Sequence, residues 1–230
     1  KVALITGSAK GLGREIALAL ADWGYVPIIH YNKSRDEAEK VVGEIGEKGV
    51  KTKAYSADLL KEEDVDQFLK KIIADFGAID LLINNVGNFL YKDFGTTSNA
   101  EFRDMVESNI YPTLYLSRAV LPNMRKRKSG QIINIGAVGA DRIIIRAKST
   151  PYFIGKTGVF ILTKIMAWEE AKHNIRINMV SPASLVEDIF KASDFPVGRS
   201  AKPADVISAI KFLISNENSY INGANIEVAG

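Results

Sequence analysis

The chain has 230 residues, of which 30 are Lys or Arg, 27 are Asp or Glu and 47% are hydrophobic. This length suits one α/β domain with a large core and is short for two. The nearly balanced charge of +3 does not indicate a nucleic-acid-binding protein. The absence of Cys excludes disulfides and thiolate chemistry, and no apolar run is long enough to cross a membrane. With no visible signal peptide, we expect a cytoplasmic protein.

The chain opens with a short apolar run, Val2–Ile5, which has the pattern of a strand buried on both faces. A glycine-rich turn follows, in which Gly7, Gly11 and Gly13 give the spacing T-G-x-x-x-G-x-G. From Ile16 onward, apolar residues recur at helical spacing. Strand, glycine turn and helix predict a dinucleotide-binding unit, because glycines let the backbone approach a pyrophosphate and a helix N-terminus attracts the anion.

The residues after the predicted second strand, residues 26–30, bear on which dinucleotide binds. An acid there would bind the ribose 2′-hydroxyl of NAD and repel a 2′-phosphate. This chain instead has no acid before Asp36 and places these residues there: Tyr31, Asn32, Lys33, Ser34 and Arg35. Lys33 and Arg35 offer positive charge, and Lys10 in the glycine turn could reach the same phosphate. Either loop cation alone could be merely solvated, so the missing acid is the stronger argument for NADPH over NADH.

Strands and helices alternate through the rest of the chain. Further strands are predicted at residues 51–55, 79–83, 131–135, 175–180 and 225–228, and helices at residues 36–47, 62–76, 101–124, 158–173 and 202–214. In the helix at residues 101–124, Pro112 predicts an interruption or kink. The alternation predicts a single-domain Rossmann-type doubly wound parallel sheet of about seven strands over residues 1–230.

Polar residues follow the third and fourth predicted strands. Asp58 comes just after the third strand, at the ligand-binding edge of an open parallel sheet, although it could also form an Asx turn or cap the next helix. Asn84, Asn85, Val86 and Gly87 follow the fourth strand and suit a turn that forms a wall beside a cofactor.

Tyr152 and Lys156 are four residues apart, so on a helix they share one face. An unperturbed Tyr has a pKa of about 10, and a neighbouring ammonium is expected to lower it toward the range useful for acid–base catalysis. Pro151 suits the start of this helix. His30 and His173 lack partners at metal or triad spacing, so we interpret both as structural or solvent-facing and predict no metal site.

The motifs T-G-x-x-x-G-x-G, N-N-V-G and Y-F-I-G-K together resemble those of the short-chain dehydrogenase/reductase family, and the resemblance covers essentially the whole chain. It implies hydride transfer from NADPH to a carbonyl or imine. Tyr152 would protonate the product, Lys156 would tune Tyr152 and bind the nicotinamide ribose, and Asn109 would support a proton relay.

The motifs and the resemblance assign the cofactor NADP(H) to residues at the carboxyl edge of the sheet. Within this set, the resemblance implies that Asp58 binds the adenine amino group, and Pro182 and Ala183 stand where the family has a P-G segment beside the nicotinamide. The predicted cofactor-binding residues are Gly7, Ser8, Lys10, Gly11, Leu12, Gly13, Tyr31, Asn32, Lys33, Ser34, Asp58, Leu59, Asn85, Val86, Gly87, Tyr152, Lys156, Pro182 and Ala183.

One position departs from the family pattern. Where the family has a Ser that binds the substrate carbonyl, this chain has Ala137 or Gly139, depending on the alignment. Asp141 could substitute, since pteridine reductases, a branch of the family, use an Asp near this place, and Ser149 and Thr150 are other candidates. The predicted substrate lid, residues 185–197, is shorter than the family would suggest.

The likeness is greatest to 3-oxoacyl-[acyl-carrier-protein] reductases, which implies an acyl-thioester or other small-molecule substrate. A pteridine reductase is the alternative, suggested by residues 30–34 and the missing Ser. A cofactor-binding regulator with little catalysis is the alternative of another class. The resemblance further implies a homo-oligomer, a tetramer or dimer formed through the two long helices, with no nucleic acid or membrane as partner.

Overall fold

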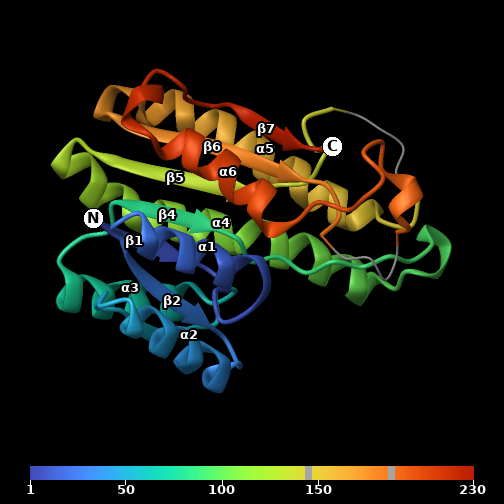
Figure 1. Ribbon diagram of the computed structural model, residues 1–230. Helices are drawn as coiled ribbons and strands as arrows, with labels where there is room; N and C mark the ends of the chain where they lie inside the picture. Colours follow the sequence, from blue (N-terminus) through green and yellow to red (C-terminus); the bar gives the residue numbers. More distant parts are fainter. Residues whose placement is uncertain (143–146, 186–189) are drawn as a thin grey trace.

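The computed structural model describes residues 1–142, 147–185 and 190–230 (Figure 1). In this part of the chain, seven parallel strands form one sheet in the order β3-β2-β1-β4-β5-β6-β7. The strands are β1 (Val2–Ile5), β2 (Val26–Tyr31), β3 (Lys53–Ser56), β4 (Leu81–Asn84), β5 (Gly130–Ile135), β6 (Ile175–Pro182) and β7 (Asn225–Val228). The order reverses between β1 and β4, which is where ligands bind in a doubly wound sheet.

Six α-helices within the described residues cover the two faces of the sheet (Figure 1). One hydrophobic core joins the sheet to α1 (Gly11–Asp22), α2 (Arg35–Glu47) and α6 (Pro203–Ile214). A second core joins it to α3 (Glu62–Phe76), α4 (Asn99–Arg127) and α5 (Thr150–Glu170). The predicted fold class is therefore confirmed.

The apolar run of β1 is buried on both faces, as its pattern predicted. Ala3, Leu4 and Ile5 are all fully buried. Because successive residues of a strand point to opposite faces, Leu4 packs in the core beside α3 and α4, whereas Ala3 and Ile5 pack in the core beside α1 and α2. The strand is thus fixed from both sides, and the glycine turn that follows it starts from a rigid position.

Helix α4 differs from its prediction, because it continues without a break from Asn99 to Arg127. The predicted interruption at Pro112 is wrong: a proline removes one backbone hydrogen bond, but its fixed φ is compatible with a helix, and packing against α5 and α3 supports the remainder. Pro112 leaves the carbonyl of Ser108 without its usual amide donor. This carbonyl is one residue before Asn109.

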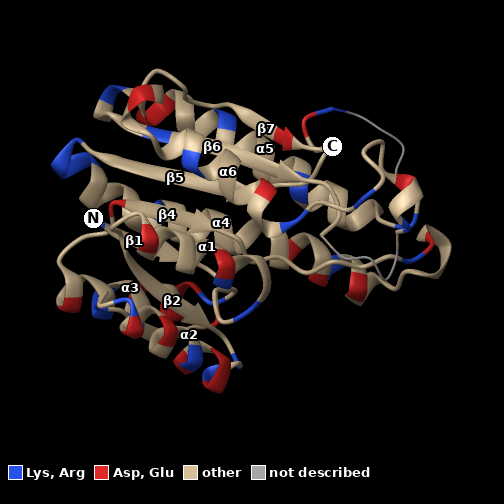
Figure 2. Ribbon diagram, viewed as in Figure 1, with Lys and Arg blue, Asp and Glu red and all other residues tan. Residues whose placement is uncertain are grey.

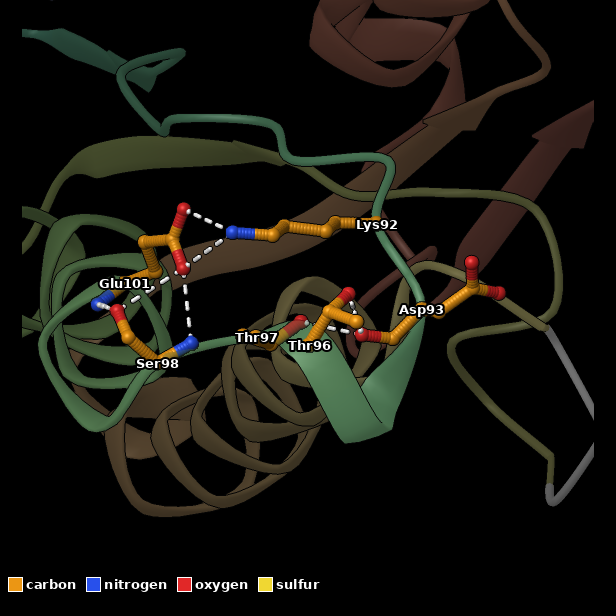
Figure 3. Close-up of polar contacts among 6 residues, drawn as sticks. All are labelled: Lys92, Asp93, Thr96, Thr97, Ser98 and Glu101. Atoms are coloured by element: carbon orange, nitrogen blue, oxygen red, sulfur yellow. Dashed lines mark hydrogen bonds and ion pairs between the residues drawn. The ribbon is translucent and has the colours of Figure 1, made fainter.

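The loop before α4 is tied to the helix start (Figure 3). Ser98 and Glu101 form a capping box, and Lys92 Nζ donates to both carboxylate oxygens of Glu101 at 2.8 and 2.9 Å. The hydrogen bond from Lys92 contributes most to holding the pKa of Glu101 at about 2. Just before the helix, the hydroxyls of Thr96 and Thr97 donate to the carbonyl of Asp93.

Charges of both signs are interspersed over the outer helices, while β1, β4 and β5 carry none (Figure 2). Two residues of the basic run that ends α4 are paired with acids. Arg125 binds Glu170 on α5, and Arg127 binds Asp80 at 2.7 Å. Within the described ranges, no helix is long and apolar enough to cross a membrane.

Candidate active site

The glycine turn has the backbone conformations that its glycines permit. Gly7 and Gly11 have φ values of +61° and +58°, which L side chains rarely adopt. Gly13 is needed for a close approach: a Cβ there would lie 2.4 Å from the carbonyl oxygen of Gly7 and 2.8 Å from Nδ2 of Asn85. The spacing T-G-x-x-x-G-x-G therefore has a steric cause at each glycine.

Thr6 connects this turn to the loop after β4. Its hydroxyl oxygen accepts hydrogen bonds from the backbone N–H groups of Asn85 (2.8 Å) and Val86 (3.0 Å), and the Asn85 side chain donates to the Thr6 carbonyl at 3.0 Å. The motifs T-G-x-x-x-G-x-G and N-N-V-G, 79 residues apart, thus form one structure at the reversal of the strand order.

His30 and Ser8 hold the other side of the turn. His30, at 2% exposure, is buried between the glycine turn and the loop after β3. Burial lowers its pKa to about 4, so the imidazole is neutral at physiological pH. The sequence left His30 as structural or solvent-facing, and no spacing rule pointed to its contact with the glycine turn.

The start of α1 fits a pyrophosphate. The N-cap residue, Lys10, provides no side-chain hydrogen bond to the helix, so no side chain caps the N–H groups of the first turn. A Cβ added to Gly11 would meet nothing within 4 Å, which shows open space above the turn. Unused N–H donors beside open space are the features that bind a phosphate at a helix N-terminus.

Three of the residues predicted for the nucleoside end line one open pocket of about 450 Å³. Asn32, Lys33 and Asp58 all line it, together with Lys61 and Lys71. Asp58 also forms the Asx turn considered above, since its Oδ1 accepts from the N–H of Leu60 at 3.2 Å. The structure therefore brings the end of β2 and the end of β3 together, with cations outnumbering acids in the lining.

Tyr152 and Lys156 lie in the first two turns of α5, which has Pro151 at its start. Lys156 Nζ is buried, lies 5.7 Å from the centroid of the Tyr152 ring, and donates to the carbonyl of Ile135 at 2.8 Å. Burial lowers the pKa of Lys156 to about 8 and raises that of Tyr152 to about 12. The expectation that Lys156 lowers the pKa of Tyr152 is thus wrong here, because burial of the phenol dominates.

Asn109 lies beside Gly155 on α5 and, with Lys156, beside Gly87. Its amide nitrogen donates to the carbonyls of Asn88 (2.9 Å) and Met105 (2.8 Å), whereas its buried Oδ1 has no partner among the described residues. A Cβ on Gly87 would lie 2.3 Å from this Oδ1 and 3.3 Å from Lys156 Nζ. The structure therefore brings the ends of β4 and β5 together with α4 and α5 around one small space.

The two positions considered for the missing Ser, Ala137 and Gly139, both lie in the loop after β5. Gly139 has a φ of +85°, which disfavours any side chain, and its N–H donates to Glu227 on β7. Asp141 accepts from Asn225 Nδ2 at 3.0 Å and lies 3.6 Å from Arg142, so its carboxylate is partly engaged on the β7 side. Its second oxygen is buried without a hydrogen-bond partner in the described part of the chain.

Two other predicted regions are only partly defined. Pro182 ends β6, and the N–H of Ala183 donates to the carbonyl of Val228 at 2.9 Å. Of the predicted lid, residues 186–189 lie outside the described residues, while residues 192–194 form a short 3₁₀ helix. In the described ranges, no group of three or more His, Cys, Asp or Glu side chains could hold a metal ion.

The profile of the short chain dehydrogenase family matches residues 1–194. The chain belongs to the short-chain dehydrogenase/reductase family. This family consists of oxidoreductases that use a nicotinamide cofactor, which agrees with the glycine turn and with the tyrosine–lysine pair on α5.

Curated relatives of this short-chain dehydrogenase/reductase include two proteins named 3-oxoacyl-[acyl-carrier-protein] reductase FabG. The one from Staphylococcus epidermidis is 34% identical over the whole chain and 98% of its own length. The one from Staphylococcus aureus is 33% identical over the whole chain and 97% of its own length. FabG of Vibrio harveyi is 34% identical over the whole chain and 96% of its own length. A crystal structure from Agrobacterium tumefaciens, of a protein provisionally named a gluconate dehydrogenase, superposes with a TM-score of 0.93 at 26% identity, covering 100% of this chain and 94% of that one.

Proposed function

We propose that this short-chain dehydrogenase/reductase uses NADPH to reduce the 3-carbonyl group of an acyl thioester. The observation that carries the proposal is the pair formed by the half-buried Tyr152 and the buried Lys156, with Asn109 nearby, at the sheet edge that also holds the glycine turn. The full-length similarity to proteins named 3-oxoacyl-[acyl-carrier-protein] reductase supports the substrate class.

In this proposal the bound cofactor would supply the hydride, and residues of the chain transfer the proton. Tyr152, with a pKa raised to about 12, keeps its proton at neutral pH and donates it to the substrate oxygen. Lys156 has further N–H donors besides the one used on Ile135, and these would hold the nicotinamide ribose and stabilise the phenolate that forms. We place Asn109, with its unpaired Oδ1, in the relay that reprotonates Tyr152.

The preference for NADPH has a direct test. Neutral substitutions of Lys10, Lys33 and Arg35, singly and together, should weaken NADPH binding much more than NADH binding, because only NADPH carries the 2′-phosphate. The dissociation constants of both cofactors are measured by nicotinamide fluorescence. Equal losses for the two cofactors would contradict the preference.

The substrate class is tested by NADPH oxidation with two compounds, an acetoacetyl thioester and dihydrobiopterin. Turnover of the thioester supports the proposal and shows that a Ser at position 137 or 139 is dispensable. Turnover of the pterin alone would favour the pteridine reductase and direct attention to Asp141. Binding of NADPH without turnover of either compound would contradict the proposed substrate and leave the cofactor-binding regulator in place.

We also propose that the chain forms a homo-oligomer through α5. Ile154, Ile161, Ile165 and Trp168 are exposed, and their spacing places them in one stripe along the helix. Trp168 is 87% exposed in the single chain. Trp168→Lys together with Ile161→Lys should lower the molar mass in sedimentation, whereas an unchanged mass would exclude this surface.

A further inference from the structure

His30 makes four hydrogen bonds, three of which hold the glycine turn. Its backbone N–H donates to Ser8 Oγ (3.0 Å), its carbonyl accepts from the Ser8 N–H (3.0 Å), and its Nδ1 accepts from the Gly7 N–H at 2.9 Å. On the far side of the ring, Nε2 lies 3.2 Å from the carbonyl oxygen of Ala57, in the loop after β3. One side chain thus links the ends of β1, β2 and β3.

The partners fix the protonation state of the ring. The Gly7 N–H is a donor, so Nδ1 must accept and carry no proton. The carbonyl of Ala57 is an acceptor, so Nε2 must carry the proton. Only the neutral Nε2–H tautomer satisfies both contacts, and Phe68 packs against the ring edge at a centroid distance of 5.3 Å.

We propose that His30 is a positioning residue for the cofactor: by accepting the hydrogen bond from Gly7, it holds the glycine turn in the shape that receives the pyrophosphate. This inference rests on the proposed cofactor-dependent function. Gly7 has a left-handed φ, and its carbonyl packs against Gly13, so a shift of the turn at Gly7 would change its position relative to the start of α1.

The second attachment of the turn makes this role separable from folding. Thr6 is held by Asn85 and Val86 whether or not His30 is present, so β1 stays paired with β4. Removing the acceptor for Gly7 should therefore loosen residues 7–10 while the rest of the sheet keeps its contacts. We expect cofactor affinity to change, and the rate of the chemical step at saturating cofactor to remain.

Two substitutions of similar size separate the two ring contacts. His30→Asn places an amide oxygen where Nδ1 stands and keeps the acceptor for Gly7. His30→Gln extends its amide nitrogen to the place of Nε2, keeping the donor to Ala57 and losing the acceptor. Each variant is assayed for thermal stability, for NADPH dissociation constant by fluorescence, for kcat, and for amide exchange of a peptide covering residues 6–13 without cofactor.

We expect His30→Gln to weaken NADPH binding about tenfold, the effect of one lost hydrogen bond, with kcat nearly unchanged. The rate of amide exchange in residues 6–13 should rise in the same variant. His30→Asn should stay close to wild type in both its NADPH dissociation constant and its exchange rate. Equal behaviour of the two variants, in affinity and in exchange, would overturn the positioning role.

The exchange experiment contains no cofactor, so it distinguishes this inference from the proposed function. Faster exchange in His30→Gln but not in His30→Asn supports the role of His30 in shaping the turn. If the two variants show this difference but the wild-type protein fails to bind NADPH, the proposed function is overturned. The assignment of the turn to a pyrophosphate then falls with it.

Discussion

The two halves of the sheet's carboxyl edge differ in how completely their polar groups are paired. At the ends of β1, β2 and β3, the side chains of Thr6, Ser8 and His30 all have hydrogen-bond partners within the protein. Near the ends of β4 and β5, Asn84 Oδ1 and Asn109 Oδ1 are buried without one among the described residues. Unpaired buried polar atoms are uncommon and call for a functional explanation. The polar side chains of the first half are thus satisfied within the protein, whereas the second half retains side-chain acceptors without a partner among the described residues.

The largest expected effect lies in the second half. Tyr152→Phe should lower kcat/KM for an acetoacetyl thioester by about a thousandfold, because it removes the proton donor. The NADPH dissociation constant should stay within about twofold, the small change expected when a hydroxyl that contacts only the reacting centre is lost.

Tyr91→Phe is the matched control, since Tyr91 is an exposed tyrosine whose ring meets that of Phe190 in a T-shaped contact. Like Tyr152→Phe, this substitution removes one phenolic hydroxyl, but it should leave kcat/KM near the wild-type value. Equal losses in the two variants would show that Tyr152 is not the acid.

In the first half, the buried His30 should make stability depend on pH. Its pKa falls from 6.5 in the unfolded chain to about 4 in the folded one, so the unfolded state binds the proton more readily between these values. The neutral, buried imidazole therefore contributes about 3 kcal/mol to the free energy of unfolding above pH 6.5. This contribution is lost as the pH falls through 4.

Urea unfolding of wild type and His30→Asn from pH 7 to pH 4 measures this contribution. The carboxylates titrate in both proteins, so the difference between the two curves isolates the imidazole. Parallel curves would show that His30 is not neutralised by burial.

Crowding at Gly13 gives the next effect. Gly13→Ala should destabilise the protein by about 2 kcal/mol, because its Cβ would press on the carbonyl of Gly7. NADPH binding should weaken as well, since the turn must move. Thermal unfolding and nicotinamide fluorescence measure the two effects.

Gly43→Ala is the control within a helix, where an added Cβ meets nothing within 4 Å. It should stabilise the protein by about 0.5 to 1 kcal/mol through helix propensity. A neutral Gly13→Ala would mean that the close contact between Gly7 and Gly13 is not required.

The smallest expected effect is a pH dependence of catalysis from Lys156. Burial lowers its pKa to about 8, so the ammonium is present below that pH and lost above it. kcat/KM should therefore fall about tenfold per pH unit above 8, as expected for one essential protonated group. Initial rates from pH 6 to pH 9.5 measure the profile, and a flat profile would show that the charge of Lys156 is not needed.

The sequence was a good guide where local patterns decide the structure. The strands Val2–Ile5 and Asn225–Val228 and the helix Glu62–Phe76 match their predictions, because buried runs and amphipathic spacing are local signals. Pro112 misled the prediction for α4, since propensity does not include the packing that supports the helix on both sides of it.

The contacts between distant segments could not be predicted in the same way. The motifs placed Tyr152 and Lys156 on one face, but only the fold shows that Lys156 reaches the carbonyl of Ile135 and that burial raises the pKa of the phenol. His30 gave no signal at all, because its partners Gly7 and Ala57 are brought to it by strand pairing.

The link between Thr6 and the loop after β4 also sets an order of assembly. Both amide donors to the Thr6 hydroxyl come 79 and 80 residues later in the chain, so β1 leaves the ribosome well before they do. Contacts of such sequence separation form slowly, because a long loop must close first. The glycine turn is therefore synthesised well before the loop that fixes it, and it takes its final shape only after that loop has folded. NADPH binding would consequently report that the nascent chain has folded through β4.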